Sequence, residues 1–192
     1  ASFLNSGQIC LCGSRVLIHS SIYDEFMSRY LEQLQSFEIG PVISDSHRDK
    51  VMSYVELALQ EGGEILAGGN IPDKPGSWIE PTVIGGLSHK SRTATEEIFG
   101  PVVTIHQFDS DDEAIQIANS TQYGLAGSVW SKNKGRAIAE KIDSGMVWVN
   151  TWLHRDLRVP FGGVKDSGVG REGGMWSVGF FSEAVNICVM ED

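Results

Sequence analysis

A cysteine lies at the boundary between a polar, glycine-containing segment and an apolar run near the start of the chain. Residues Phe3–Cys10 read FLNSGQIC, and the apolar run covers Ser14–His19. Such a junction can leave a thiol exposed beside free backbone N–H groups, and donors of this kind lower the pKa of a thiol. Cys10 is therefore a candidate nucleophile, although a buried and inert thiol is the commoner fate of a lone cysteine.

A second candidate is a pair of acidic residues followed by an aromatic residue and a turn. Residues Glu96–Pro101 read EEIFGP and precede an apolar run. A carboxylate only accepts hydrogen bonds and can do so with both oxygens, so it suits two adjacent hydroxyl groups. The Gly-Pro pair predicts a turn into the next strand. An exposed acidic pair in front of a buried strand would have the same composition.

A third candidate is the glycine-rich segment 160–172, which reads PFGGVKDSGVGRE. It has no helical or strand periodicity and is expected to be an ordered loop. Gly168, Gly170 and Gly173 spell the letters of a dinucleotide-binding fingerprint. That fingerprint requires a strand before it and a helix after it. We expect neither here, so the sequence does not favour this interpretation.

These three segments, taken in order, resemble motifs of the aldehyde dehydrogenase superfamily. FLNSGQIC resembles the family pattern F-x-N-x-G-Q-x-C, EEIFGP resembles E-x-F-G-P, and the third segment resembles P-F-G-G-x-K-x-S-G-x-G-R-E. Tyr123–Ala126 (YGLA) and Gly145–Asn150 (GMVWVN) also resemble family segments. The resemblance covers nearly the whole chain.

The resemblance implies a role for each motif. Cys10 would attack the aldehyde carbon to give a thiohemiacetal, with its own N–H in the oxyanion hole. Glu97 would accept hydrogen bonds from the nicotinamide-ribose hydroxyls of NAD, and Phe99 would pack against that end of the cofactor; NADP is not excluded. Phe161 would lie near the aldehyde. Cys12 is expected to be a packing neighbour without a chemical role.

Two arginines suggest the class of aldehyde. The pattern N-x-W-x-x-R-D-L-R, which starts at Asn150, looks most like that of the 2-hydroxymuconate and 2-aminomuconate semialdehyde dehydrogenases. Their substrates also carry a carboxylate, which a guanidinium group can bind with two hydrogen bonds. We therefore expect Arg155 to hold the substrate acid, with Arg158 as the alternative. Both arginines could instead be structural and pair with Asp156 or Glu172.

Composition excludes several other classes of function. The 192 residues carry a formal net charge of -10, and no basic stripe indicates a nucleic-acid partner. No run approaches the roughly 20 apolar residues that span a bilayer, so no membrane partner is expected. The five histidines are scattered and two of the three cysteines are spaced C-x-C, so we expect no metal site. The few cysteines argue for a reducing compartment and a cytoplasmic location.

Apolar runs alternate with helical patterns, which predicts an α/β fold with a mostly parallel sheet flanked by helices. Residues 1–180 are expected to form the catalytic domain, and residues 181–192 a C-terminal strand and tail of the kind that assembles a homo-oligomer. The predicted strands are Ser14–His19, Glu64–Ala67, Trp78–Ile84, Val102–Phe108, Leu125–Trp130, Met146–Asn150 and Val185–Val189. The predicted helices are Ile22–Gln35, capped by Ser20 or Ser21, Asp45–Gly62, a helix from Ser110 to Asn119, and Asn133–Asp143.

The chain begins inside a motif, so we interpret it as a fragment. In the resembled family the general-base glutamate, the side-chain asparagine of the oxyanion hole and the cofactor-binding domain all precede the nucleophile. The connection from Phe37 to Gly40 is also shorter than usual, through either a deletion or omitted loop residues. A non-catalytic assembly domain of the same fold is the main alternative. A cofactor-free cysteine hydrolase is weaker, because His19, the nearest possible base, lies at the far end of a strand.

Overall fold

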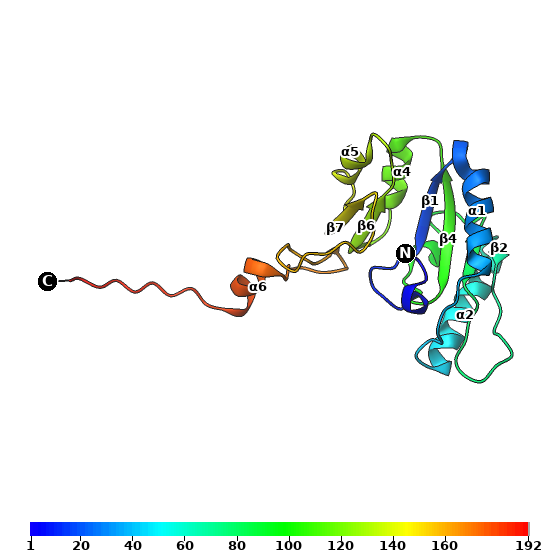
Figure 1. Cartoon of the computed structure of the whole chain (residues 1–192), viewed down its shortest axis with the longest axis horizontal. Helices are drawn as coiled ribbons and strands as arrows, with labels where there is room; N and C mark the ends of the chain where they lie inside the picture. The colour runs from blue at the N-terminus through cyan, green and yellow to red at the C-terminus, as the bar shows by residue number, and fades with distance from the viewer. Residues whose placement is uncertain (192) are drawn as a thin grey trace.

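The computed structural model describes residues 1–191, and a four-stranded sheet in the order β1-β4-β3-β2 forms its main body (Figure 1). β4 runs parallel to β1 and β3, whereas β2 is antiparallel to β3. The predicted α/β fold with a mostly parallel sheet is therefore confirmed. The strands of this sheet are β1 (Arg15–His19), β2 (Glu64–Ala67), β3 (Thr82–Gly85) and β4 (Val102–Phe108). The helices are α1 (Tyr23–Gln35), α2 (Asp45–Gln60), α3 (Arg92–Thr95), α4 (Asp111–Ala118), α5 (Gly135–Ala139) and α6 (Gly174–Phe181), with 3-10 turns η1 (Leu4–Gly7) and η2 (Ser20–Ile22).

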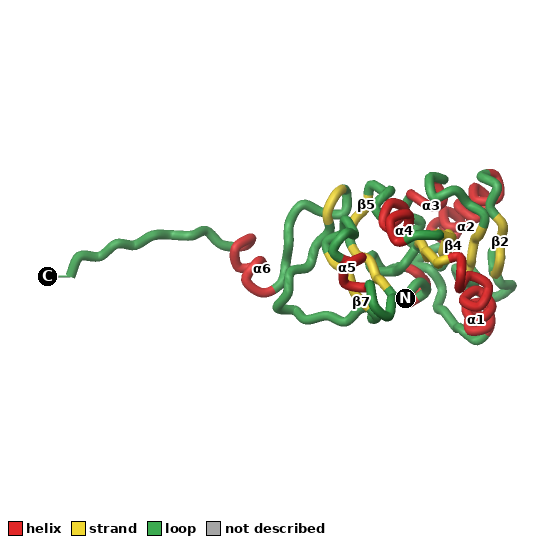
Figure 2. The backbone as a smooth tube through the Cα atoms, turned by 90° about the horizontal axis from the view of Figure 1, so that it is seen from above, coloured by secondary structure: helices red, strands yellow, loops and turns green. Residues whose placement is uncertain are grey.

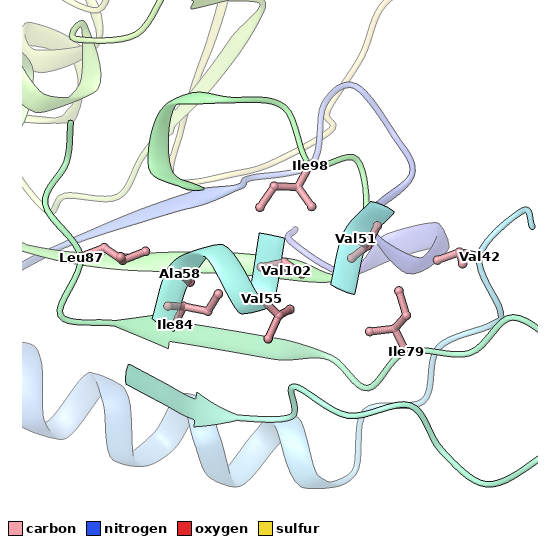
Figure 3. Close-up of a cluster of buried hydrophobic side chains, with 9 residues drawn as sticks. All are labelled: Val42, Val51, Val55, Ala58, Ile79, Ile84, Leu87, Ile98 and Val102. Carbon is pink, nitrogen blue, oxygen red and sulfur yellow. The ribbon is translucent and has the colours of Figure 1, made fainter. Parts of the chain in front are cut away.

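α1 and α2 cover opposite faces of the sheet because side chains alternate along each strand. Val83 and Val103 belong to the cluster that contains Met27 of α1. Ile84, which follows Val83 in β3, and Val102, which precedes Val103 in β4, belong to the cluster under α2. Figure 3 shows this second cluster between α2 and the two central strands. Its buried members are Val42, Val51, Val55, Ala58, Ile79, Ile84, Leu87, Ile98 and Val102.

α2 has well-defined ends. The Ser44 hydroxyl accepts a hydrogen bond from the His47 N–H at 3.2 Å, which caps the helix, and Gly62 with φ +85° follows its C-terminus. The i, i+3, i+4 spacing of Val51, Tyr54, Val55, Ala58 and Leu59 predicts one buried stripe along this helix. Leu59 is 55% exposed, so the prediction was wrong for that residue. The buried positions of α2 are Val51, Val55 and Ala58.

A smaller part of the chain follows the main sheet. β6 (Ala126–Val129) and β7 (Met146–Val149) pair in parallel, and α5 packs on both strands. β5 (Tyr123–Gly124) pairs antiparallel with β8 (Val164–Lys165). α6 and residues 182–191 extend away from all three sheets (Figures 1 and 2).

Several element boundaries differ from the predicted ones. The strand predicted from Trp78 begins only at Thr82, because Pro81 has no N–H to donate to the sheet. The cap predicted at Ser20 or Ser21 was wrong: those residues form a 3-10 turn, and the His19 ring accepts the Ser21 N–H. The α5 helix is also shorter at both ends than predicted.

The glycine-rich loop and the C-terminus contain elements that the sequence pattern did not predict. We expected neither a strand before nor a helix after the Gly168, Gly170 and Gly173 letters, and this was wrong: the short strand β8 precedes them within the loop, and helix α6 follows directly after Gly173. The predicted strand Val185–Val189 pairs with no strand in residues 1–191, and its apolar side chains are exposed. Among the described residues, no helix is both long and apolar enough to cross a membrane. No group of His, Cys, Asp and Glu side chains there is arranged to hold a metal ion.

Candidate active site

The loop before Cys10 has an unusual backbone conformation. Asn5, Ser6 and Gly7 all adopt left-handed φ values of 50°, 56° and 71°. For the two residues with side chains this costs on the order of 1 kcal/mol each, and such strain is concentrated at functional sites. The Ser6 hydroxyl is buried and donates to the Gly40 carbonyl at 2.7 Å, which holds the turn in place. Cys10 lies exposed in the turn that follows.

This loop touches the Glu96–Pro101 segment backbone to backbone. A Cβ atom on Gly7 would lie 2.0 Å from the carbonyl oxygen of Gly100, so no side chain fits at position 7. The first two predicted motifs, although far apart in sequence, are therefore adjacent. Glycine at position 7 is required both for the positive φ and for the close approach.

The Glu96–Pro101 segment directs two candidate groups outward. Ile98 is 4% exposed and belongs to the core under α2, while Phe99 is 37% exposed and has φ 61°. Glu97 is also exposed, and its carboxylate accepts no hydrogen bond from any of residues 1–191. A free carboxylate beside an exposed ring fits the hydroxyl and ring surfaces of a nicotinamide nucleoside.

The segment with the two arginines also contacts the Cys10 loop. The Trp152 indole N–H donates to the Leu11 carbonyl at 3.1 Å, one residue after Cys10. The Arg155 guanidinium lies over the Phe161 ring at 4.4 Å. Within residues 1–191 Arg155 has no carboxylate partner. The structure thus joins Arg155 to Phe161 and links their segment to the Cys10 loop.

Arg158 is already paired. Its Nε lies 2.9 Å from the Asp156 carboxylate, and further hydrogen bonds join the same two side chains. This pairing lowers the pKa of Asp156 and raises the pKa of Arg158. Both side chains remain well exposed, so the pair adds little stability. Arg158 therefore has a carboxylate partner, whereas Arg155 has none in the part of the chain that the structure describes.

The two neighbouring cysteines differ in environment. Cys12 is half-buried, and burial raises the pKa of its thiol, which donates to the Leu4 carbonyl at 3.5 Å. A raised pKa keeps Cys12 as the thiol, the less reactive form. His19, the alternative base, lies at the end of β1 and is engaged by the Ser21 N–H and the Phe108 ring.

Two residues of α2 reach this site and were not identified from the sequence. The His47 Nε2 donates to the Phe99 carbonyl at 2.7 Å, and the Lys50 ammonium lies 3.4 Å from the Glu97 carbonyl. Their spacing of one helical turn places both on one face of α2. No local pattern indicates these contacts, because they join segments about fifty residues apart.

The fold and these motifs agree with the similarity of the chain to known proteins. The model of the aldehyde dehydrogenase family matches residues 1–187, and the chain belongs to this family. It is 49% identical to the 2-aminomuconic 6-semialdehyde dehydrogenase of a Pseudomonas species, across 100% of the chain and 43% of that protein. It is 44% identical to human 2-aminomuconic semialdehyde dehydrogenase, across 98% of the chain and 43% of that protein.

The solved structures give the same family. A betaine aldehyde dehydrogenase from Staphylococcus aureus in complex with NAD+ superposes with a TM-score of 0.90 at 39% identity. This superposition covers 94% of the chain and 39% of that structure. The chain thus spans about two fifths of the length of the relatives it matches. The match to the Pseudomonas enzyme runs over 209 aligned positions, 17 more than the 192 residues of the chain, so the alignment contains gaps in this chain.

The Gly7 contact can be tested by comparing two left-handed glycines. Gly7→Ala should lower the free energy of unfolding by about 2 kcal/mol more than Gly62→Ala, because it adds steric overlap to backbone strain. Gly62 has φ +85° but nothing within 4 Å of its Cβ position, so it reports the strain alone. Urea unfolding followed by circular dichroism measures both. Equal losses would mean that the two loops do not touch.

Proposed function

We propose that this chain forms the nucleophile-bearing part of an NAD-dependent aldehyde dehydrogenase that oxidises a semialdehyde acid. The proposal rests chiefly on the backbone contact that joins the Cys10 loop to the segment bearing Glu97 and Phe99. Membership of the family and the NAD+ complex of the Staphylococcus aureus relative support it.

Cys10 acts as the nucleophile in this proposal. Its sulfur forms a bond to the aldehyde carbon while the carbonyl electrons move to oxygen, giving a thiohemiacetal. Within residues 1–191 the Cys10 N–H donates to no other group, so it is free to stabilise that oxygen. The C=O bond then re-forms as hydride leaves the carbon, and a thioester results. Water cleaves the thioester to the carboxylic acid and restores the thiol.

Bound NAD would supply the acceptor for that hydride. Glu97 would hold the ribose hydroxyls with its free carboxylate, and the exposed Phe99 ring would pack beside the nicotinamide end. The buried Ile98 between them fixes both positions relative to the core. The chain therefore contributes the orientation of the cofactor as well as the nucleophile.

The substrate proposal is narrower and rests on Arg155. Its guanidinium is oriented by the Phe161 ring yet has no carboxylate partner among the described residues, so it can bind a substrate carboxylate. Arg158 is occupied by Asp156 and is the weaker candidate. The names of the muconic semialdehyde dehydrogenases among the relatives agree with a substrate of this class.

We also propose that residues 1–180 act as the catalytic domain and that the C-terminal residues assemble a homo-oligomer. The exposed side chains of α6 and the extended tail support this, since apolar side chains in such numbers favour burial against another chain. They include Trp176, Phe180, Phe181, Val185, Ile187 and Val189, each at least half exposed. A purely non-catalytic assembly domain would need this surface but would have no use for an exposed Cys10.

Replacing the nucleophile tests the proposed function. Cys10→Ser should lower the rate of NADH formation with aldehydes at least about a thousandfold, as removal of a catalytic nucleophile does. Cys12→Ser, at the half-buried neighbour, should retain most of the rate. Ultraviolet absorbance of the reduced cofactor measures both, in the protein that the gene encodes. Full activity of Cys10→Ser would refute the assignment, and cofactor-independent turnover alone would favour the hydrolase.

The substrate class depends on Arg155. Arg155→Ala should raise KM for a semialdehyde acid about tenfold or more, which is the loss expected for one charged hydrogen-bonded contact. KM for an unsubstituted aliphatic aldehyde of similar length should change little. Arg158→Ala is the matched control and should affect the two substrates equally. An equal effect of Arg155→Ala on both aldehydes would contradict a carboxylate-binding role.

A further inference from the structure

The conformation of Phe99 requires an explanation beyond its own sequence. It is one of few residues with a side chain that adopt a left-handed φ, here 61°. A bulky residue adopts this conformation only where its surroundings compensate for the strain, which is on the order of 1 kcal/mol. The ring remains 37% exposed, so burial of the ring alone does not compensate.

α2 contacts the Phe99 peptide and the residues on both sides of it. The His47 Nε2 donates to the Phe99 carbonyl at 2.7 Å. The Lys50 ammonium approaches the carbonyl of Glu97, two residues before Phe99, at 3.4 Å. The buried Val51 side chain packs against Gly100 so closely that a Cβ there would lie 2.6 Å from Val51 Cγ2.

His47 makes the shorter of the two hydrogen bonds from α2, and its own backbone is held in place. It lies three residues after the cap Ser44, whose hydroxyl accepts the His47 N–H at 3.2 Å. The helix start therefore fixes the backbone of His47 relative to the loop. Because a carbonyl can only accept, the ring nitrogen must carry the proton in this hydrogen bond. The bond favours one orientation of the Phe99 peptide and, through it, one direction of the Phe99 ring.

We infer that His47 is a positioning residue for cofactor binding: its hydrogen bond to the Phe99 carbonyl holds the Phe99 ring, and the neighbouring Glu97, in the binding conformation. This inference rests on the proposed function. His47 does not itself contact the reacting atoms. Loss of its hydrogen bond allows the loop to relax toward unstrained conformations, and the binding conformation then has to be restored when the cofactor binds.

The test compares NAD affinity among variants of His47. His47→Ala should raise the dissociation constant for NAD about fivefold to tenfold, and a fivefold change corresponds to roughly 1 kcal/mol. His47→Gln retains a donor at similar reach and should recover most of the affinity. Arg48→Ala, in the next residue of α2, removes ion pairs with Asp45 and Asp49 and should leave the affinity unchanged. Isothermal titration calorimetry on the protein that the gene encodes measures the NAD dissociation constants of the unmodified protein and of the three variants.

A second measurement distinguishes positioning from a general loss of structure. The alkylation rate of Cys10 by iodoacetamide, followed on its peptide by mass spectrometry, needs no cofactor and should stay within about twofold in His47→Ala. A lowered melting temperature without any change in NAD affinity would overturn the inference, as would equal affinity losses in His47→Ala and His47→Gln. If the unmodified protein binds no NAD, the proposed function fails together with it. Binding that is unaffected by His47→Ala overturns the inference alone.

Discussion

The site depends on the point where two peptide segments touch without intervening side chains, at Gly7 and Gly100. One segment leads to Cys10. The other carries Glu97 and Phe99 and leads into the start of β4. Because the contact is between backbones, the distance between the segments cannot adjust through rotamer changes. The position of the thiol relative to the carboxylate and the ring is therefore a property of the fold.

The core explains how this contact is maintained despite local strain. Asn5, Ser6 and Phe99 each cost on the order of 1 kcal/mol in their left-handed conformations. Burial of a single valine or isoleucine contributes about 1.5–3 kcal/mol, and both Val51 of α2 and Ile98 are almost fully buried beside the strained loop. Burial of a few core side chains thus offsets the strain at Asn5, Ser6 and Phe99. Through Val51 and His47, α2 holds the loop that contains Phe99 against this core.

Much of the fold was predictable from the sequence, because local patterns specify it. β2 and β4 have their predicted bounds, since alternating or continuous apolar residues there are flanked by turn residues. α3 was missed because it has only four residues and, besides its local cap Ser91, depends on the Glu61 carboxylate, 31 residues before Arg92, to accept the Arg92 and Thr93 N–H groups. α6 was missed because two glycines at its start are unfavourable for a helix.

The candidate site was predictable as residue types but not as an arrangement. Cys10, Glu97 and Phe99 were identified from family motifs, yet only the three-dimensional structure shows that Arg158 is paired with Asp156 and that Arg155 has no carboxylate partner among residues 1–191. No sequence pattern indicated a role for His47, because it binds a backbone carbonyl 52 residues away. Every residue has such a carbonyl, so the residue type of the partner does not reveal the contact. Contacts from side chain to distant backbone are in general not visible in a single sequence.

A crystal structure of the encoded protein with NAD and an unreactive analogue of a semialdehyde acid would test the central claim most directly. The account predicts that the Glu97 carboxylate binds the nicotinamide-ribose hydroxyls, that the Cys10 sulfur faces the carbon corresponding to the aldehyde, and that Arg155 binds the carboxylate of the analogue. A cofactor bound away from Glu97 and Phe99, or a Cys10 sulfur directed away from the analogue, would contradict it.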